Sequence, residues 1–203
     1  ILLAGGAFIA SNACFYVIIT WVIAYGTSTL GMSREMILGC IMFGSVCMIP
    51  ALIFVAHLSD TIGRYGIFRM GCITTGIWAF VFFPLLEMGN VYAVAAAIAI
   101  ALCCVAMMYG PQAALFAELF STEVRYSGAT LGYQVGVLLG GGFTPMVATA
   151  LFASSGTSLS VAFYMAGSCF ISVICVSLLH GRRSREESAD ALIIPAAAQQ
   201  GRE

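Results

Sequence analysis

Seven uncharged polar side chains lie inside apolar stretches of the chain, where polar groups are costly to bury. They are Asn12, Tyr16 and Thr20 in the first stretch, Tyr109 and Gln112 in the fourth, and Tyr133 and Gln134 in the fifth. Residues four apart share one helix face, so Asn12, Tyr16 and Thr20 are predicted to point the same way. The seven could line a cavity for a small polar solute, or they could hydrogen-bond between helices. The amides are the stronger candidates for binding, because an amide has both donors and acceptors to satisfy.

A second group of residues that could do chemistry is charged and lies in two polar loops. The loop after the second apolar stretch contains Asp60, Gly63 and Arg64. Glycine permits a tight turn there, across which the carboxylate and the guanidinium can pair. The loop after the fourth stretch contains Glu118, Glu123 and Arg125. We expect the two clusters to form one network that holds helix ends together; the alternative is a pair of solvated loops, in which each exposed ion pair contributes about 0–1 kcal/mol.

No pattern for catalysis or metal binding accompanies these residues. The two histidines, His57 and His180, lie at the ends of apolar stretches, where neither forms an evident buried pair with a serine. All eight cysteines fall within apolar stretches and lack the paired spacing of a zinc site. They are expected to pack as small hydrophobic residues. We therefore predict no catalytic residue, no metal and no cofactor, and a membrane enzyme is disfavoured.

The elements that must position these side chains follow from the composition. Of 203 residues, 61% are hydrophobic and 8% are charged, with a net charge of −1. A soluble domain has about 25% charged residues, so a soluble enzyme, a disordered linker and a nucleic-acid binder are excluded. About 20 helical residues cross the bilayer core of about 30 Å. The sequence thus predicts an all-α membrane protein with six spans, at roughly Ile1–Leu30, Met36–Ala56, Met70–Leu86, Val91–Ala117, Gly128–Phe152 and Leu159–Leu179.

The arginines indicate which ends of the spans face the cytoplasm. Seven of the eight follow the second, fourth or sixth span, and only Arg34 lies on the other side. Because basic residues favour cytoplasmic loops, both ends of the six-span block are predicted to be cytoplasmic. Residues 181–203 form a polar tail with no evident reason to fold alone. Since an apolar stretch begins at Ile1 without an initiator methionine, we expect the chain to be the C-terminal part of a longer protein.

The fifth span has the most regular pattern in the sequence. Glycines recur every four residues and a proline follows them, at Gly128, Gly132, Gly136, Gly140 and Pro145. Small residues on one helix face let another backbone approach closely, which predicts a packing face. The Gly140–Pro145 end is also expected to bend or unwind locally, as the moving helices of transporters do.

The first polar loop resembles a signature of the major facilitator superfamily. Residues 60–64 read Asp-Thr-Ile-Gly-Arg, similar to the loop that recurs in that superfamily between helices eight and nine. Three nearby positions depart from the usual pattern, namely Ala56, Thr61 and Tyr65. The residues that could form the ion pair and its turn are kept.

The second polar loop and its flanking spans are similar to one branch of that superfamily, the metabolite:proton symporters. The similarity lies in residues 109–120, in residues 125–134 and in the glycines at 140–142. The branch includes bacterial carriers of shikimate, α-ketoglutarate, citrate, and proline or betaine. The resemblance covers residues 12–180, and it implies that the six spans are helices seven to twelve of a twelve-helix fold.

The resemblance also implies a function and a location. It implies a secondary transporter in the bacterial inner membrane that moves a small polar metabolite by alternating access, with proton symport. The charged loop residues would hold the outward-facing state, while Asn12, Tyr16 and Gln112 would face the central cavity. The N-terminal six-helix half would be the missing partner. Because no Asp, Glu, Lys or Arg lies near the middle of a span, that half is also expected to hold the proton carrier. A sugar-porter-type facilitator and a non-transporting membrane partner subunit remain the alternatives.

Overall fold

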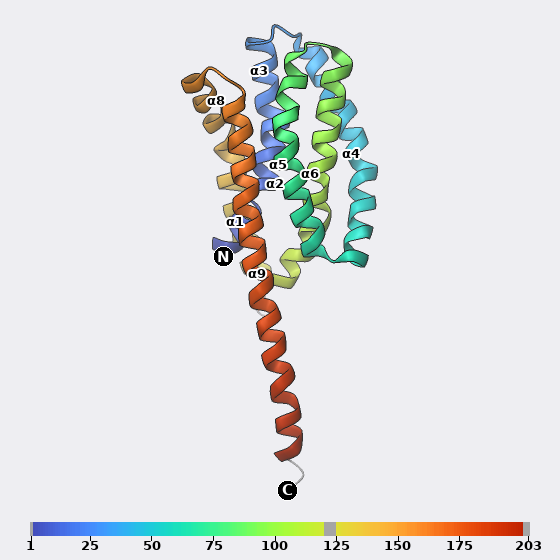
Figure 1. The fold of residues 1–203 in the computed structure, drawn as a ribbon, viewed down its shortest axis with the longest axis vertical. Coiled ribbons are helices and arrows are strands. Elements are labelled where there is room, and N and C mark those ends of the chain that lie inside the picture. Colours follow the sequence, from blue (N-terminus) through green and yellow to red (C-terminus); the bar gives the residue numbers. More distant parts are fainter. Residues whose placement is uncertain (1, 120–124, 201–203) are drawn as a thin grey trace.

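The computed structural model describes residues 2–119 and 125–200; in residues 2, 4, 116–119, 125–129 and 182–200 it describes the backbone but not the side chains. Within these residues the chain is helical and contains no strand (Figure 1). Its elements are α1 (Leu2–Ala7), α2 (Ile9–Tyr16), η1 (Val17–Trp21), α3 (Val22–Ser28), α4 (Arg34–Ile62), α5 (Arg64–Glu87), α6 (Val91–Leu119), α7 (Arg125–Val137), η2 (Leu138–Gly142), α8 (Thr144–Ser155) and α9 (Leu159–Gln200). The segments η1 and η2 are π-helical.

Six helical stretches of the described chain are long and apolar enough to cross a bilayer, which confirms the predicted all-α, six-span fold class. They run over Ile9–Ser28, Arg34–Ile62, Arg64–Glu87, Val91–Leu115, Thr130–Ser155 and Leu159–Gly181. The main difference from the predicted bounds is at the first polar loop, where α4 continues to Ile62 and α5 begins at Arg64. Only Gly63 separates the two helices, and its φ of 108° is a conformation that residues with a Cβ rarely adopt.

The spans form one bundle in which the first span is the most enclosed. α4 packs against α6, α6 against α5, and α5 against α9, so that α4 and α8 lie on opposite sides of the molecule (Figure 1). Of the first span, 61% of the residues in its most apolar window are buried inside the bundle, against 17% for α4. Side chains such as Phe8, Val17 and Ile18 are fully buried. The first span therefore forms the centre around which the other spans pack.

A buried serine from the last span supports the break between α1 and α2. Phe8 leaves the helical conformation, with φ −105° and ψ 5°. Ser172 Oγ on α9 accepts a hydrogen bond from the Ala10 amide at 3.1 Å and donates one to the Gly6 carbonyl at 3.0 Å. Because lipid supplies no partner for an unpaired backbone group, this side chain makes the break tolerable inside the bundle.

The fifth span is irregular over the segment where the sequence predicts bending or unwinding. Its α-helix gives way to the π-helical segment η2, and Phe143 separates that segment from α8. The glycines before the bend lie very close to the first span. A Cβ on Gly136 would sit 3.2 Å from the Gly5 carbonyl oxygen, and one on Gly140 would sit 2.5 Å from that of Ile9. Only glycine fits this approach without a shift of backbone.

The last helix continues past the membrane span. α9 runs to Gln200 and projects well beyond the bundle (Figure 1), through residues that the sequence predicts to be a polar tail with no evident reason to fold alone. That segment is rich in arginine, glutamate and alanine, which are strong helix formers. A span that is already helical removes the cost of nucleating the next turn, which is the physical reason for the difference.

Candidate functional site

Four of the seven polar residues identified in the sequence line one hollow in the bundle. The hollow has a volume of about 390 Å³, within the range of small-molecule sites. Its lining is Asn12, Phe15, Tyr16, Met48, Leu52, Tyr109, Tyr133 and Val137. These residues come from α2, α4, α6 and α7, so four different spans build the wall. None of the lining side chains carries a charge, and the polar groups are one amide and three phenols.

The amide of Asn12 is held in a fixed orientation between two spans. Its Oδ1 accepts a hydrogen bond from the Tyr109 hydroxyl at 3.4 Å, and its Nδ2 donates to the Phe8 carbonyl at 3.0 Å. The Tyr109 ring packs edge-on against Phe15, with ring centroids 5.6 Å apart. Asn12 is only 2% exposed. A buried, oriented amide next to a phenol can recognise hydroxyl or carboxylate oxygens of a small solute.

The position of the Tyr16 ring in the wall of the hollow depends on a glycine of η2. A Cβ on Gly141 would lie 2.7 Å from Tyr16 Cε2, so the absence of a side chain there makes room for the Tyr16 ring. Tyr16 also packs edge-on against Phe15, at 6.0 Å between ring centroids. Tyr133, on α7, lines the same hollow and is 40% exposed. The irregular fifth span thus shapes one side of the hollow.

The other three predicted cavity residues lie outside this lining. Gln112 is buried on α6, one turn from Tyr109, and its Oε1 has no hydrogen-bond partner among the described residues. Gln134 and Thr20 are exposed. The prediction for Thr20 assumed α-helical spacing, whereas η1 lies between Tyr16 and Val22. A π-turn closes with i→i+5 bonds, so the residues in it are displaced around the helix axis.

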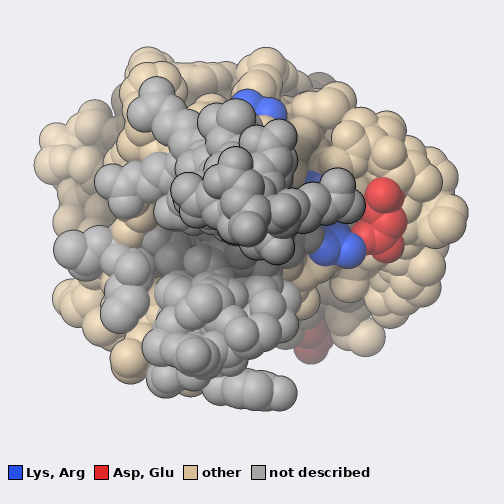
Figure 2. Space-filling view, turned by 90° about the horizontal axis from the view of Figure 1, so that it is seen from below, with Lys and Arg blue, Asp and Glu red and all other residues tan. Residues whose placement is uncertain are grey.

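One half of the predicted charge network falls within the described side chains. Arg64 donates to Asp60 Oδ1 from Nε at 3.2 Å and from Nη2 at 2.9 Å. The two side chains are 34% and 59% exposed, so solvent screens the pair. Figure 2, which views this end of the molecule, shows basic and acidic atoms in contact at one side of this face, with further charged atoms elsewhere on it. The side chains of Glu118, Glu123 and Arg125 lie outside the described residues, and the wider network stays a prediction.

Comparison with known proteins shows which proteins this chain is similar to. The shikimate transporter of Escherichia coli (strain K12) is 35% identical over 169 residues, which are 81% of this chain and 38% of that protein. The inner membrane metabolite transport protein YhjE of the same organism is 33% identical over 190 residues, 88% of this chain and 42% of that protein. The chain belongs to the major facilitator superfamily. A proline/betaine transporter of the same strain is 28% identical over 166 residues, which are 79% of this chain and 32% of that protein.

This chain matches only part of the length of its relatives. It spans about two fifths of the length of the first two curated proteins that it matches. No family model and no solved structure matches it. The relatives' names describe transporters, which agrees with the prediction that the chain is not an enzyme. The prediction of the superfamily from the two polar loops is confirmed.

Four residues that line the hollow were not predicted from the sequence. They are Phe15, Met48, Leu52 and Val137, and all are apolar. Met48 and Leu52 are four apart on α4 and so share a helix face, but nothing in an apolar span distinguishes a cavity face from a lipid face. The hollow's apolar side could be assigned only from the packing.

Proposed function

We propose that the protein containing this chain is a secondary transporter of a small polar metabolite, an organic acid or a zwitterion, coupled to protons. The observation that carries the proposal is the uncharged hollow in which Asn12 and Tyr109 join two spans. The named solutes of the relatives, shikimate and proline or betaine, belong to this chemical class. Such solutes present hydroxyl, carboxylate or ammonium groups that an amide and phenols can hydrogen-bond.

The geometry supports alternating access by one half of a two-part carrier. In transporters built from repeats, the site lies between bundles that rock against each other. The hollow is lined by α2, α4, α6 and α7 and not by α5 and α9. We propose that the second six-helix half packs on the face of the bundle that carries the hollow. A carboxylate solute usually pairs with a cation, and no lining residue of the hollow is basic. We therefore propose that the second half supplies the cationic partner and the proton carrier.

The proposed orientation follows from charge. Seven of the eight arginines lie on the side of the membrane to which Asp60 and the C-terminus belong. Basic residues favour the cytoplasmic side, so we propose that both ends of the bundle face the cytoplasm of a bacterial cell. The ion pair of Asp60 and Arg64 would then act as a latch on the cytoplasmic ends of α4 and α5 in the outward-facing state.

Uptake into proteoliposomes tests the proposal directly. The full-length protein is reconstituted, and uptake of labelled shikimate and labelled proline is followed with an imposed proton gradient, inside alkaline. We expect saturable accumulation of at least one solute, abolished by an uncoupler. Uptake that equilibrates and ignores the uncoupler would replace symport by a sugar-porter-type facilitator. Absence of uptake of both solutes and of any competing small polar metabolite would favour a non-transporting subunit.

A further inference from the structure

A groove runs along the outside of the bundle between α5 and α9. Its middle is a hollow of about 480 Å³ with an apolar lining that includes Ile77, Phe80 and Ala166. Its end, where α5 finishes and α9 begins, is a second hollow of about 420 Å³ that includes Phe80, Pro84 and Glu87. Phe80 lines both hollows, and its ring packs edge-on against Phe163 of α9, with ring centroids 5.2 Å apart. The two hollows therefore adjoin at this ring pair along one face of α5, and together we call them the groove, apolar within the span and polar at its end.

The end of the groove presents a carboxylate that has no basic partner among the side chains that the structure describes. Glu87 Oε1 accepts hydrogen bonds from the Tyr25 hydroxyl at 2.9 Å and from the Ser158 hydroxyl at 2.6 Å. These contacts fix the carboxylate at the junction of α3, α5 and the start of α9. No arginine, lysine or histidine is among the residues that line either hollow. Of the described residues at this end of the bundle, Arg34 is the basic one, and it lies outside the groove.

The surroundings of Glu87 suit an ammonium group. Four aromatic rings line the same hollow, those of Tyr25, Phe80, Phe83 and Phe152. A carboxylate gives an ammonium group a charge-assisted hydrogen bond. The hydroxyl residues Thr29 and Thr157 also line the hollow, where they can donate hydrogen bonds to a phosphate. The hollow thus offers a carboxylate for a cation beside hydroxyl donors for an anion.

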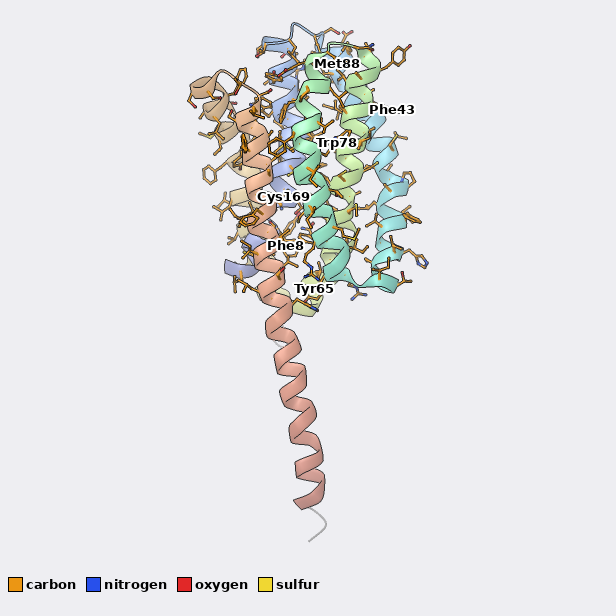
Figure 3. The ribbon with its side chains drawn as sticks, in the orientation of Figure 1. Phe8, Phe43, Tyr65, Trp78, Met88 and Cys169 are labelled. Atoms are coloured by element: carbon orange, nitrogen blue, oxygen red, sulfur yellow. The ribbon has the colours of Figure 1, made fainter. Side chains whose placement is uncertain are left out.

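The groove is longer than one leaflet of the bilayer core. Its α5 lining runs from Glu87 to Cys72, fifteen residues, which is about 22 Å at the rise of an α-helix. Half of a hydrocarbon core of about 30 Å is about 15 Å, so the part from Glu87 to Ile77 spans one leaflet. In Figure 3, Met88 marks the polar end of the groove, and Cys169 marks its apolar middle on α9. The polar end therefore lies at headgroup depth, and the apolar part lies at the depth of an acyl chain.

We propose that the groove between α5 and α9 binds an aminophospholipid. Its ammonium group lies against Glu87, its phosphate is near the hydroxyls of Thr29 and Thr157, and one acyl chain follows the apolar part past Phe80 and Ala166. The site is separate from the substrate hollow, which α5 and α9 do not line. A lipid with a phosphate but no amine places a negative group near Glu87 without compensation, so the site selects for the amine.

Native mass spectrometry of the purified full-length protein, stripped of lipid, tests the site with two probes. Dioleoyl phosphatidylethanolamine is expected to bind with a dissociation constant about tenfold lower than dioleoyl phosphatidylglycerol, the size of effect that one charge-assisted contact gives. In Glu87→Gln the amide oxygen still accepts from Tyr25 and Ser158, but the charge is gone, and the two lipids should bind within about twofold of each other. Glu35→Gln, which removes the other carboxylate at this end, should keep the tenfold preference.

A second variant tests the acyl part and does not depend on Glu87. Ala166→Phe fills the apolar hollow and should weaken both lipids while keeping their ratio. Equal binding of the two lipids by the unaltered protein would overturn the proposal, whether or not Glu87→Gln folds. So would an equal loss of preference in Glu35→Gln. If free ethanolamine displaces phosphatidylethanolamine as well as the lipid itself does, the hollow binds a soluble ammonium ion and the lipid assignment is wrong.

Discussion

The Tyr109 hydroxyl donates a hydrogen bond to Asn12 Oδ1 at 3.4 Å, which joins α6 to α2 in the wall of the uncharged hollow. At 3.4 Å the bond is longer than the usual O–H···O distance of about 2.7–2.8 Å. A solute that enters the hollow can therefore take over either group at little cost. The same two residues position α2 against α6, so binding and helix position are linked at this point.

Asn12→Ala should raise the half-saturating solute concentration. The substitution removes one neutral hydrogen bond from the wall, and such a bond is worth about 0.5–1.5 kcal/mol, or roughly a two- to tenfold change. The measurement is the concentration dependence of uptake in proteoliposomes. Thr20→Ala is the matched control, since Thr20 is on the same span but is exposed and outside the hollow. An unchanged half-saturation in Asn12→Ala would make this residue a packing group.

Arg64→Ala should slow transport more than it weakens binding. The ion pair with Asp60 is 34% and 59% exposed, so its loss costs at most about 1 kcal/mol of stability, and the melting temperature should hardly move. We expect the maximal uptake rate to fall by up to about fivefold, equivalent to at most about 1 kcal/mol in a barrier, with half-saturation nearly constant. Arg34→Ala, at the opposite end of α4, is the control. Weakened binding at an unaltered rate would contradict the latch.

Gly140→Ala should destabilise the bundle, because its Cβ would lie 2.5 Å from the Ile9 carbonyl oxygen. Crowding of this kind costs about 1–3 kcal/mol, seen as a lower melting temperature in detergent. Gly142→Ala is the control two residues away, where the nearest atom to a new Cβ is Leu138 Cδ1 at 3.7 Å. If both variants melt alike, the close packing of the fifth span on the first is not what stabilises this region.

Gly141→Ala should alter solute affinity through Tyr16. A Cβ on Gly141 would meet the ring at 2.7 Å, and the ring must move within the hollow that it lines. We expect a changed half-saturation, by about threefold or more if one hydrogen bond is lost, and the same change in Tyr16→Ala. The double variant should show no further change, since both act on one ring. Additive effects in the double variant would contradict the coupling.

The sequence was sufficient for the spans and for the family, because both depend on local composition and short motifs. Charge-free stretches set the six helices, and the residues around Asp60 and Tyr109 indicated the superfamily. Two kinds of feature were out of reach. The π-helical segment η1 changes the face on which Thr20 lies, and no local pattern announces such a segment. The contacts of Glu87 with Tyr25 and Ser158 join positions 62 and 71 residues apart, which one sequence without packing cannot pair.

The single-residue connection at Gly63 also constrains how the bundle can move. Helices joined by a long loop can slide past each other, but α4 and α5 have no slack between Ile62 and Arg64. A tilt of one must therefore displace the adjoining end of the other, while the far ends of both stay packed against α6. A spectroscopic probe attached beside Gly63 would then record the displacement of both helices.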